Sequence, residues 1–393
     1  MKGYIPSNLY LGASRRSDKY SYIITLIYYG RIFNKELESD SFIPLNGKIL
    51  LRLLGGRYKA FINYLLNQNI LETDGRYIIG EKSKGYRLTK QFREQKSKEV
   101  TIKDEKLLSK ISMFKEMQKK QIKLDHHFYL YNCLQDVTIQ YDEAKYFIER
   151  NVTDCCQYVS YNISVDMIES KSFFFTVDST AGRVHNNITN LSRDLRPFLR
   201  WNDKGLVEID IANSQPFLFN ILIDTYYKSM SVSNSDINLS YGNQNIEKMN
   251  DIQRYRYLTS NGIFYEYLMD KMEVKEDRQE FKIRFFSKIF FSKDNSGYVT
   301  DERRQFKKLF PYVSEIVSYY KKNDYRKLAI SLQRAEAEII INKVVPKLAE
   351  KGIYVLTIHD SILTTTENVK LVEQTIKEEF KNNYNLYPTI KIK

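Results

Sequence analysis

The sequence predicts an α+β protein with more than one domain. Its 393 residues, of which 42% are hydrophobic, are enough to bury a sizeable core and to divide into two or more domains. The first hundred residues combine helical apolar spacing with short strand-like runs. Two later strand-like runs, 205–211 and 354–365, each carry an aspartate at a strand end, and helical patterns separate them.

The bulk composition favours a polyanionic partner. A net charge of +13 and a pI near 9.2 point first to nucleic acid. The three cysteines, Cys133, Cys155 and Cys156, have no zinc-site or disulfide spacing, which fits a reducing cytoplasm. The apolar run Tyr22–Tyr29 is too short to span a bilayer, and no signal peptide precedes it. We therefore expect a cytoplasmic protein without a membrane partner.

Residues 1–95 are expected to form a small N-terminal domain. Residues 1 to about 20 are polar and basic and are interpreted as a tail. Helices are predicted over 20–32, 45–54 and 57–68, and strands over 70–72 and 76–79. This order resembles a winged helix. Its basic residues would then be candidate DNA contacts: Arg57, Lys59, Lys82, Lys84 and Arg87. The alternative is a structural or protein-docking domain.

The next segment, 96–175, has a mixed sequence pattern that indicates no clear arrangement of elements. Residues 91–123 are highly charged, with sparse apolar residues at helical spacing. Such a run is usually a solvated helix face, and here it is also a candidate arm along a duplex backbone. Farther on, Ser231–Asp251 is rich in Ser and Asn and is interpreted as an insertion loop.

The stretch 205–219 reads as a short buried strand that ends at Asp210 and turns into an apolar helix reaching about Tyr227. The stretch 354–365 reads as two strands with Asp360 at their tight junction. Two carboxylates at strand ends are suitable ligands for a pair of magnesium ions.

Between the two carboxylates lies a candidate nucleotide-binding helix, Asp277–Ser292. Four of its side chains recur every four residues and so share one helical stripe: Arg278, Lys282, Phe286 and Phe290. The guanidinium and ammonium groups suit a triphosphate, and the aromatic rings suit a base and sugar. The alternative is ordinary packing by a basic amphipathic helix.

These three stretches resemble the motifs of family-A, single-subunit nucleic-acid polymerases, the group of DNA polymerase I and the phage-type RNA polymerases. The stretch 205–219 resembles motif A, Arg278–Phe290 resembles motif B and 354–365 resembles motif C. The stretch 180–198 is similar to the segment before motif A that touches the primer–template minor groove. The stretch 331–339 is similar to the Gln-bearing helix that precedes motif C.

The resemblance implies a right-hand fold. Residues 176–393 would form the palm and fingers, with the fingers at about 228–328, and residues 96–175 would form a thumb-like region. It also implies two Mg²⁺ ions, or Mn²⁺ in their place, held by Asp210, Asp360 and the Ile211 carbonyl. The remaining roles would fall to nucleotide contacts at Gln215, Arg278, Lys282, Phe286 and Phe290, and to primer–template contacts at Arg183, Asn190, Gln333 and His359.

Departures from the family pattern bear on the product. DNA-making members usually carry Glu at the position of Gln215, as a steric gate against the ribose 2′-hydroxyl. RNA-making members tend to have Gly there and Tyr at the position of Phe290. In contrast, Ser361 resembles the RNA-polymerase form of motif C. Ser287 stands where motif B usually has Gly. Two features thus favour deoxynucleotides and one favours ribonucleotides.

We therefore predict a template-directed DNA polymerase of a phage or mobile element, extending a DNA primer–template with nucleoside triphosphates and lacking a proofreading exonuclease. One alternative is an RNA polymerase, primase or template-independent nucleotidyltransferase on the same fold. Another is a catalytically inactive DNA-binding replication-initiation protein. The sequence leaves open the template, the priming mode, processivity, the oligomeric state and what the N-terminal domain recognises.

Overall fold

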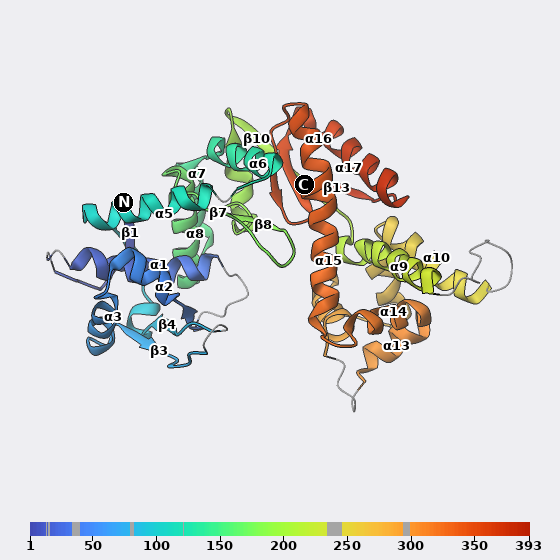
Figure 1. Ribbon diagram of the computed structural model, residues 1–393, viewed down its shortest axis with the longest axis horizontal. Coiled ribbons are helices and arrows are strands. Elements are labelled where there is room, and N and C mark those ends of the chain that lie inside the picture. The colour runs from blue at the N-terminus through green and yellow to red at the C-terminus, as the bar shows by residue number, and fades with distance from the viewer. Residues whose placement is uncertain are drawn as a thin grey trace. The chain divides into compact units, whose positions relative to one another are not determined.

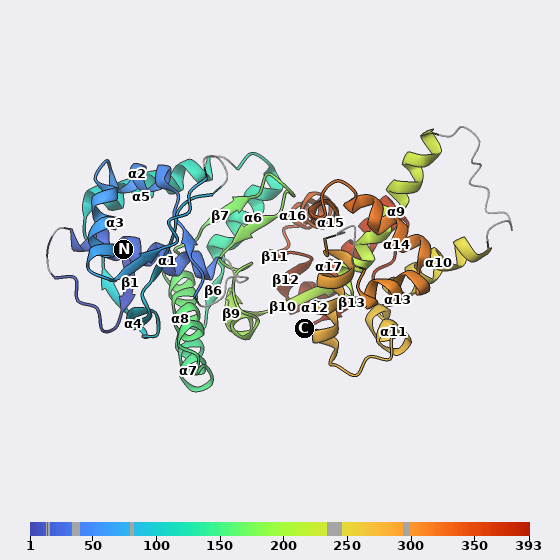
Figure 2. The same ribbon diagram turned by 90° about the horizontal axis from the view of Figure 1, so that it is seen from below.

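The computed structural model describes residues 1–12, 14, 16–33, 40–78, 82–120, 122–233, 246–293 and 299–393 (Figures 1 and 2). The chain forms two compact units. The first comprises Met1–Leu124, Tyr131–Thr176 and His185–Leu206, and the second comprises Asp125–Leu130, Val177–Val184 and Val207–Lys393. The predicted division at residues 95 and 175 stays a prediction. Within the described ranges, no helix combines the length and apolar composition needed to cross a membrane.

The first unit is built around one buried helix, α1. Its apolar residues lie on every side, and Ile23, Ile24 and Ile27 are fully buried. The prediction of a buried helix from Tyr20 to Ile32 is confirmed. The helices and strands of this unit are β1 (Lys2–Pro6), α1 (Ser17–Ile32), β2 (Ile43–Pro44), α2 (Gly47–Leu54), α3 (Tyr58–Asn67), β3 (Leu71–Thr73), β4 (Gly85–Leu88), α4 (Lys90–Arg93), β5 (Ser97–Thr101), α5 (Glu105–Lys119), β6 (Thr138–Ile139), α7 (Tyr141–Asn151), α8 (Cys155–Glu169), the 3₁₀ helix Arg193–Phe198 and β9 (Leu199–Trp201).

The first residues of the chain are part of this core. β1 pairs antiparallel with β5, and Tyr4 and Ile5 are each 3% exposed. The Tyr4 amide donates a 2.8 Å hydrogen bond to Thr25 Oγ1 of α1. The prediction of a tail over residues 1–20 is therefore wrong. A five-residue strand is too short to give a clear pattern, and its partner is distant in sequence.

The segment after α1 contains a small antiparallel sheet in the order β2-β4-β3. α2 begins two residues later than predicted, because the Asn46 side chain caps it by accepting from the Lys48 and Ile49 amides. The strand predicted over 76–79 is wrong in its described part, where Ile78 makes only an isolated bridge with Lys82. Ile79 lies outside the described residues.

The charged segment 91–123 is partly helical. Its predicted solvated helix is confirmed over α5, which buries Leu107 and leaves most of its charged residues exposed. The strand β5 within the same segment was not predicted. Its Ser, Lys, Glu and Thr residues have low hydrophobicity, so β5 is defined by pairing with β1 and not by its own composition.

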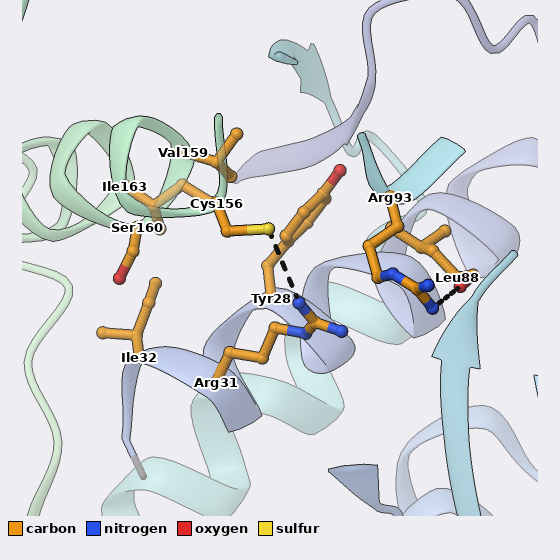
Figure 3. Close-up of a pocket in the computed structure, with 9 residues that line it drawn as sticks. All are labelled: Tyr28, Arg31, Ile32, Leu88, Arg93, Cys156, Val159, Ser160 and Ile163. Atoms are coloured by element: carbon orange, nitrogen blue, oxygen red, sulfur yellow. Dashed lines mark hydrogen bonds between the residues drawn. The ribbon is translucent and has the colours of Figure 1, made fainter. Parts of the chain in front are cut away.

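A small cavity of about 30 Å³ lies between α1, β4 and α8 in the first unit (Figure 3). Arg31 Nη1 donates to the thiol of Cys156 across 3.9 Å, and Arg93 donates to the Leu88 carbonyl across 3.3 Å. Burial raises the pKa of the Cys156 thiol, although the positive charge of Arg31 opposes this. The cavity thus encloses a protonated thiol beside a guanidinium.

Four elements contribute residues to both units: α6 (Asp125–Asp136), β7 (Phe175–Val177), β8 (Val184–Asn186) and β10 (Lys204–Ile211). The remaining elements of the second unit are α9 (Ser214–Ser233), α10 (Ile246–Ser260), α11 (Phe264–Lys271), α12 (Arg278–Phe285), the π-helical turn Phe286–Phe290, α13 (Asp301–Leu309), α14 (Pro311–Lys321), α15 (Arg326–Ile339), the π-helical turn Ile340–Val344, α16 (Val345–Glu350), β11 (Leu356–Ile358), β12 (Ser361–Thr365), the 3₁₀ turn Thr366–Asn368, α17 (Val369–Tyr384) and β13 (Ile390–Ile392).

The second unit places helices around the far end of β10. β12 neighbours β10, β11 pairs with β12 as a hairpin, and β13 pairs with β10. α9 packs against α15 (Figure 1). Phe217 of α9 contacts Phe380 of α17 at a ring-centroid distance of 5.2 Å. The predicted strand-to-helix turn after Asp210 and the predicted hairpin around Asp360 are both confirmed.

The predicted insertion loop Ser231–Asp251 falls mostly outside the described residues. In its described parts, α9 continues to Ser233 and α10 begins at Ile246, so the prediction of a loop is wrong there.

Candidate active site

The two predicted metal-binding carboxylates come together. Asp210 is the penultimate residue of β10, and Asp360 lies in the turn between β11 and β12, the latter being the neighbour of β10. Burial raises the pKa of Asp360, and the negative charge of Asp210 raises it further. The Asp210 side chain is 21% exposed, so the pair is open to solvent on one side.

Two non-glycine residues with left-handed backbone shape this end of the sheet. His359 has φ 55° immediately before Asp360, and Asn213 has φ 51° between β10 and α9. Such residues are uncommon because Cβ crowds the backbone, and Asn tolerates the conformation best. Ser361 Oγ of β12 donates to the Glu208 side chain of β10 across 3.1 Å. This bond joins the two strands close in sequence to the carboxylates, because Ser361 follows Asp360 and Glu208 lies two residues before Asp210.

The predicted cations of α12 also reach this site. Burial lowers the pKa of Lys282, while the charges of Asp360 and Asp210 oppose that shift. Arg278 donates to Asn213 Oδ1 across 3.1 Å and to Glu266 across 2.6 Å. The charges of both carboxylates thus act on one lysine, and one arginine is held at the turn beside them.

Lys393 is a cation that the sequence did not single out. Because β13 pairs with β10, with Asp210 opposite Lys391, it brings the Lys393 ammonium into an ion pair with Asp210. Nothing in the local sequence 390–393 indicates a site, so only the strand pairing reveals this residue. Lys393 therefore offsets part of the negative charge of Asp210.

The donor set fits a hard divalent cation. Asp210 and Asp360 supply carboxylate oxygens, which Mg²⁺ prefers. Glu208 exchanges both backbone hydrogen bonds with Lys393, and the Ala212 amide donates to Thr389. Along an antiparallel strand, successive residues direct their backbone groups alternately toward the partner strand and away from it. Because Ala212 bonds to the β13 side, Ile211 directs its carbonyl away from β13, as a further oxygen ligand requires. Among the described residues, no cluster of three or more His, Cys, Asp or Glu side chains exists to hold a metal.

A buried glutamate links two of the predicted residues. Glu336 of α15 is 1% exposed, and its Oε2 accepts from Arg183 across 2.5 Å and from Gln215 across 3.0 Å. Burial, with a contribution from Asp360, raises the pKa of Glu336 to about 7. From the sequence, Gln333 of the same helix was predicted to contact the primer–template. Glu336, one turn later, was not predicted to have a role. Its signal would have been a carboxylate on the otherwise apolar face of α15.

The two predicted aromatic contacts pack among other aromatic rings. Phe290 is fully buried, against Phe285 at 4.7 Å and Phe219 at 5.4 Å between ring centroids. Phe286 is half-buried and stacks on Phe291. The predicted stripe assumes 3.6 residues per turn, and the π-helical turn Phe286–Phe290 breaks that period.

The other predicted primer–template residues lie in different segments of the chain. Gln333 is half-buried on α15, and His359 is exposed in the β11–β12 turn. Asn190 belongs to the first unit, where its side chain donates to the Asn186 carbonyl across 3.4 Å. Arg183 is therefore the member of this group that contacts the buried glutamate.

The predicted DNA-docking residues all lie in the first unit. Arg57 and Lys59 are exposed at the start of α3. Lys82, paired with Asp74 at 3.2 Å, and Lys84 are also exposed. Arg87 bonds Glu72 across 2.9 Å and covers the Phe42 ring, so its guanidinium is held within the unit.

Comparisons with known proteins give a weak fold likeness. No family model matches the chain, and no curated protein matches it in sequence. Among solved structures, the chain is similar to the "POL domain of Pol1 from M. smegmatis complex with DNA primer-template and dNTP", with a TM-score of 0.30 and 13% identity. The match covers 65% of this chain and 55% of that one.

Proposed function

We propose that the protein is a template-directed DNA polymerase that adds nucleotides to a primer 3′ end. One observation carries the proposal: Asp210 and Asp360 lie at neighbouring strand ends, close enough to Lys282 for both charges to act on its pKa. Two carboxylates near a half-buried ammonium match the needs of phosphoryl transfer, in which catalysis consists mostly of positioning and charge stabilisation. The order of the motif-like stretches along the chain supports the same function.

Each residue contributes chemistry that suits this reaction. Asp210 and Asp360 would hold two divalent metal ions. When bound, these ions would supply activation of the primer hydroxyl and neutralisation of the charge on the departing pyrophosphate. Lys282, as a compact ammonium, suits the triphosphate. Arg278 is fixed by Asn213 and Glu266, so its guanidinium is pre-oriented toward the same anion. Gln215, at the start of α9, is the proposed gate against ribose.

The proposal extends to the rest of the chain. We infer a right-hand arrangement with the palm around β10–β12, and a winged-helix-like region in the first unit that binds DNA through Arg57, Lys59, Lys82 and Lys84. We also infer that no 3′–5′ exonuclease is present. End-labelled primers with mismatched ends should then keep their length when incubated with the protein and Mg²⁺ without nucleotides.

Primer extension with Mg²⁺ tests the central claim. Asp210→Asn and Asp360→Asn should each lower the rate at least ~100-fold, because each removes an anionic oxygen ligand. Asp301→Asn is the matched control, since that carboxylate is 82% exposed at the start of α13. Full activity in either site variant would rule out the two-metal assignment. Parallel reactions with dNTPs and rNTPs decide between DNA synthesis and the RNA-making alternative.

Metal-dependent nucleotide binding distinguishes the remaining alternative. A polymerase should bind nucleoside triphosphate only when Mg²⁺ is added, and Lys282→Ala should weaken that binding because it removes the ammonium beside the carboxylates. A catalytically inactive DNA-binding protein should bind no nucleoside triphosphate, with or without Mg²⁺.

A further inference from the structure

Glu336 stands at the centre of a small buried network. It accepts two hydrogen bonds on the same oxygen, one from Arg183 and one from Gln215. Its other oxygen, Oε1, is buried and has no hydrogen-bond partner among the described residues. A buried carboxylate that is only half satisfied is costly to keep, so its retention calls for a role beyond packing.

The network fixes which way the Gln215 amide faces. The Gln215 amide nitrogen donates to Glu336 Oε2, so the amide turns its NH₂ group toward Glu336 and its carbonyl oxygen away. Gln215 is half-buried in the first turn of α9, five residues after Asp210. Without Glu336, this long side chain would regain rotamer freedom.

The hydrogen bond to Glu336 also fixes the position of the Arg183 side chain. Its backbone amide donates to Asp178 Oδ2 across 3.0 Å, and the loop 178–183 is tied to α15 because Arg334 donates to the Thr180 carbonyl across 2.7 Å. Arg183 therefore approaches Glu336 from a braced loop, and Gln215 approaches it from α9. One carboxylate joins both elements.

We infer that Glu336 is a positioning residue that holds Gln215 as a rigid gate, so that discrimination between deoxy- and ribonucleotides depends on Glu336 although it is buried away from solvent. This inference rests on the proposed polymerase function. Glu336 would then couple two residues: Gln215, which is proposed to contact the nucleotide sugar, and Arg183, which is proposed to contact the primer–template.

A double-mutant cycle on sugar choice tests the inference. The ratio of kcat/KM for dNTP to that for rNTP is measured in the wild type, Glu336→Ala, Gln215→Ala and the double variant. Glu336→Ala should lower the ratio ~10-fold, the equivalent of one lost positioning hydrogen bond of ~1.4 kcal/mol. The double variant should show no further loss beyond Gln215→Ala, because both changes release the same side chain.

Two more variants keep the test decisive. Glu338→Ala changes a carboxylate of the same helix that is 45% exposed and outside the network, and should leave the ratio unchanged. Glu336→Gln keeps the side-chain volume and an oxygen that can accept both bonds, but it removes the negative charge that strengthens them, so it should give an intermediate ratio. It also replaces Glu336→Ala if that variant does not fold.

The outcomes separate the two claims. If the wild type extends no primer, the proposed function fails and the inference fails with it. If the wild type extends primers and Gln215→Ala lowers the ratio while both Glu336 variants keep the wild-type value, the positioning role is overturned and the polymerase stands. An equal fall of kcat for both nucleotide sets at constant ratio would also overturn it, because Glu336 would then act only on general structure.

Discussion

At the scale of single residues, Glu336 also links folding to pH. Its pKa rises from 4.5 to about 7 on folding, mainly because burial penalises the carboxylate. The folded state therefore binds the proton more tightly than the unfolded chain does. Stability from this group is fully present below pH ~4.5 and is lost as pH rises through about 7.

We therefore predict that Glu336→Gln becomes more stable, relative to the wild type, between pH 5 and pH 8, by up to about 3 kcal/mol, since Gln stays neutral throughout. Denaturant unfolding at both pH values measures this difference, with Glu338→Gln as the exposed control. A difference in unfolding free energy that is the same at both pH values would contradict the raised pKa of the buried Glu336 carboxyl.

Cys156 gives a second prediction at this scale. Burial raises its thiol pKa, so little thiolate is present at neutral pH, and only thiolate reacts quickly with disulfide reagents. In a Cys155→Ser background, labelling at pH 7 should be slower than for a free thiol and should accelerate with pH up to at least pH 9. Arg31→Gln should slow it further, because the guanidinium favours the thiolate. Faster labelling in that variant would contradict the contact drawn in Figure 3.

At the scale of elements, the contact between α1 and β2 depends on a glycine. A Cβ added at Gly30 would lie 2.2 Å from Ile43 Cγ2, far inside contact distance. Gly30→Ala should therefore destabilise the protein by ~1–3 kcal/mol, despite the gain in helix propensity.

Ile43→Ala should relieve that clash. Because it removes the atom that Cβ would meet, the double variant should be at least ~1 kcal/mol more stable than the sum of the two single changes. Thermal or denaturant unfolding of the four proteins measures the coupling energy. Additive effects would show that β2 shifts away from α1 without cost.

Elements with a local signal were predictable from the sequence. The strand ending at Asp210 and the hairpin around Asp360 are short apolar runs with turn residues between them, and both were placed correctly. β1 and β5 were missed because their stability comes from pairing across the chain. Phe290 was placed on the site stripe because a π-helical turn leaves no mark in the spacing of apolar residues.

The candidate site shows the same limit. Asp210, Asp360 and Lys282 were predicted as site residues because each follows a pattern within one segment. Glu336 and Lys393 were overlooked because each gains its meaning from a distant partner, Arg183 in one case and Asp210 in the other. Ion pairs between segments are not encoded in either segment alone.

At the scale of the whole molecule, the net charge of +13 should dominate association with nucleic acid. Phosphate contacts release counterions, so log K should fall linearly with log salt, with a slope of about −0.9 per phosphate neutralised. Lys59→Ala should reduce the magnitude of the slope by about 1 if this exposed residue contacts phosphate.

Fluorescence anisotropy with a labelled duplex at several salt concentrations measures these slopes. Lys377→Ala serves as the control, since that lysine lies on α17 and pairs with Glu373. An unchanged slope in Lys59→Ala, or an equal change in the control, would remove α3 from the proposed docking surface.

The pairing of β13 with β10 has a consequence for how the protein is made. Lys393 and Asp210 are 183 residues apart, so the ribosome releases the strand that carries Asp210 long before its β13 partner exists. Until then, one edge of β10 presents unpaired amides and carbonyls to other nascent chains. Contacts of such long range also form slowly. The carboxylate pair therefore assembles late in synthesis, and the second unit should be the part of the chain that most needs chaperones during translation.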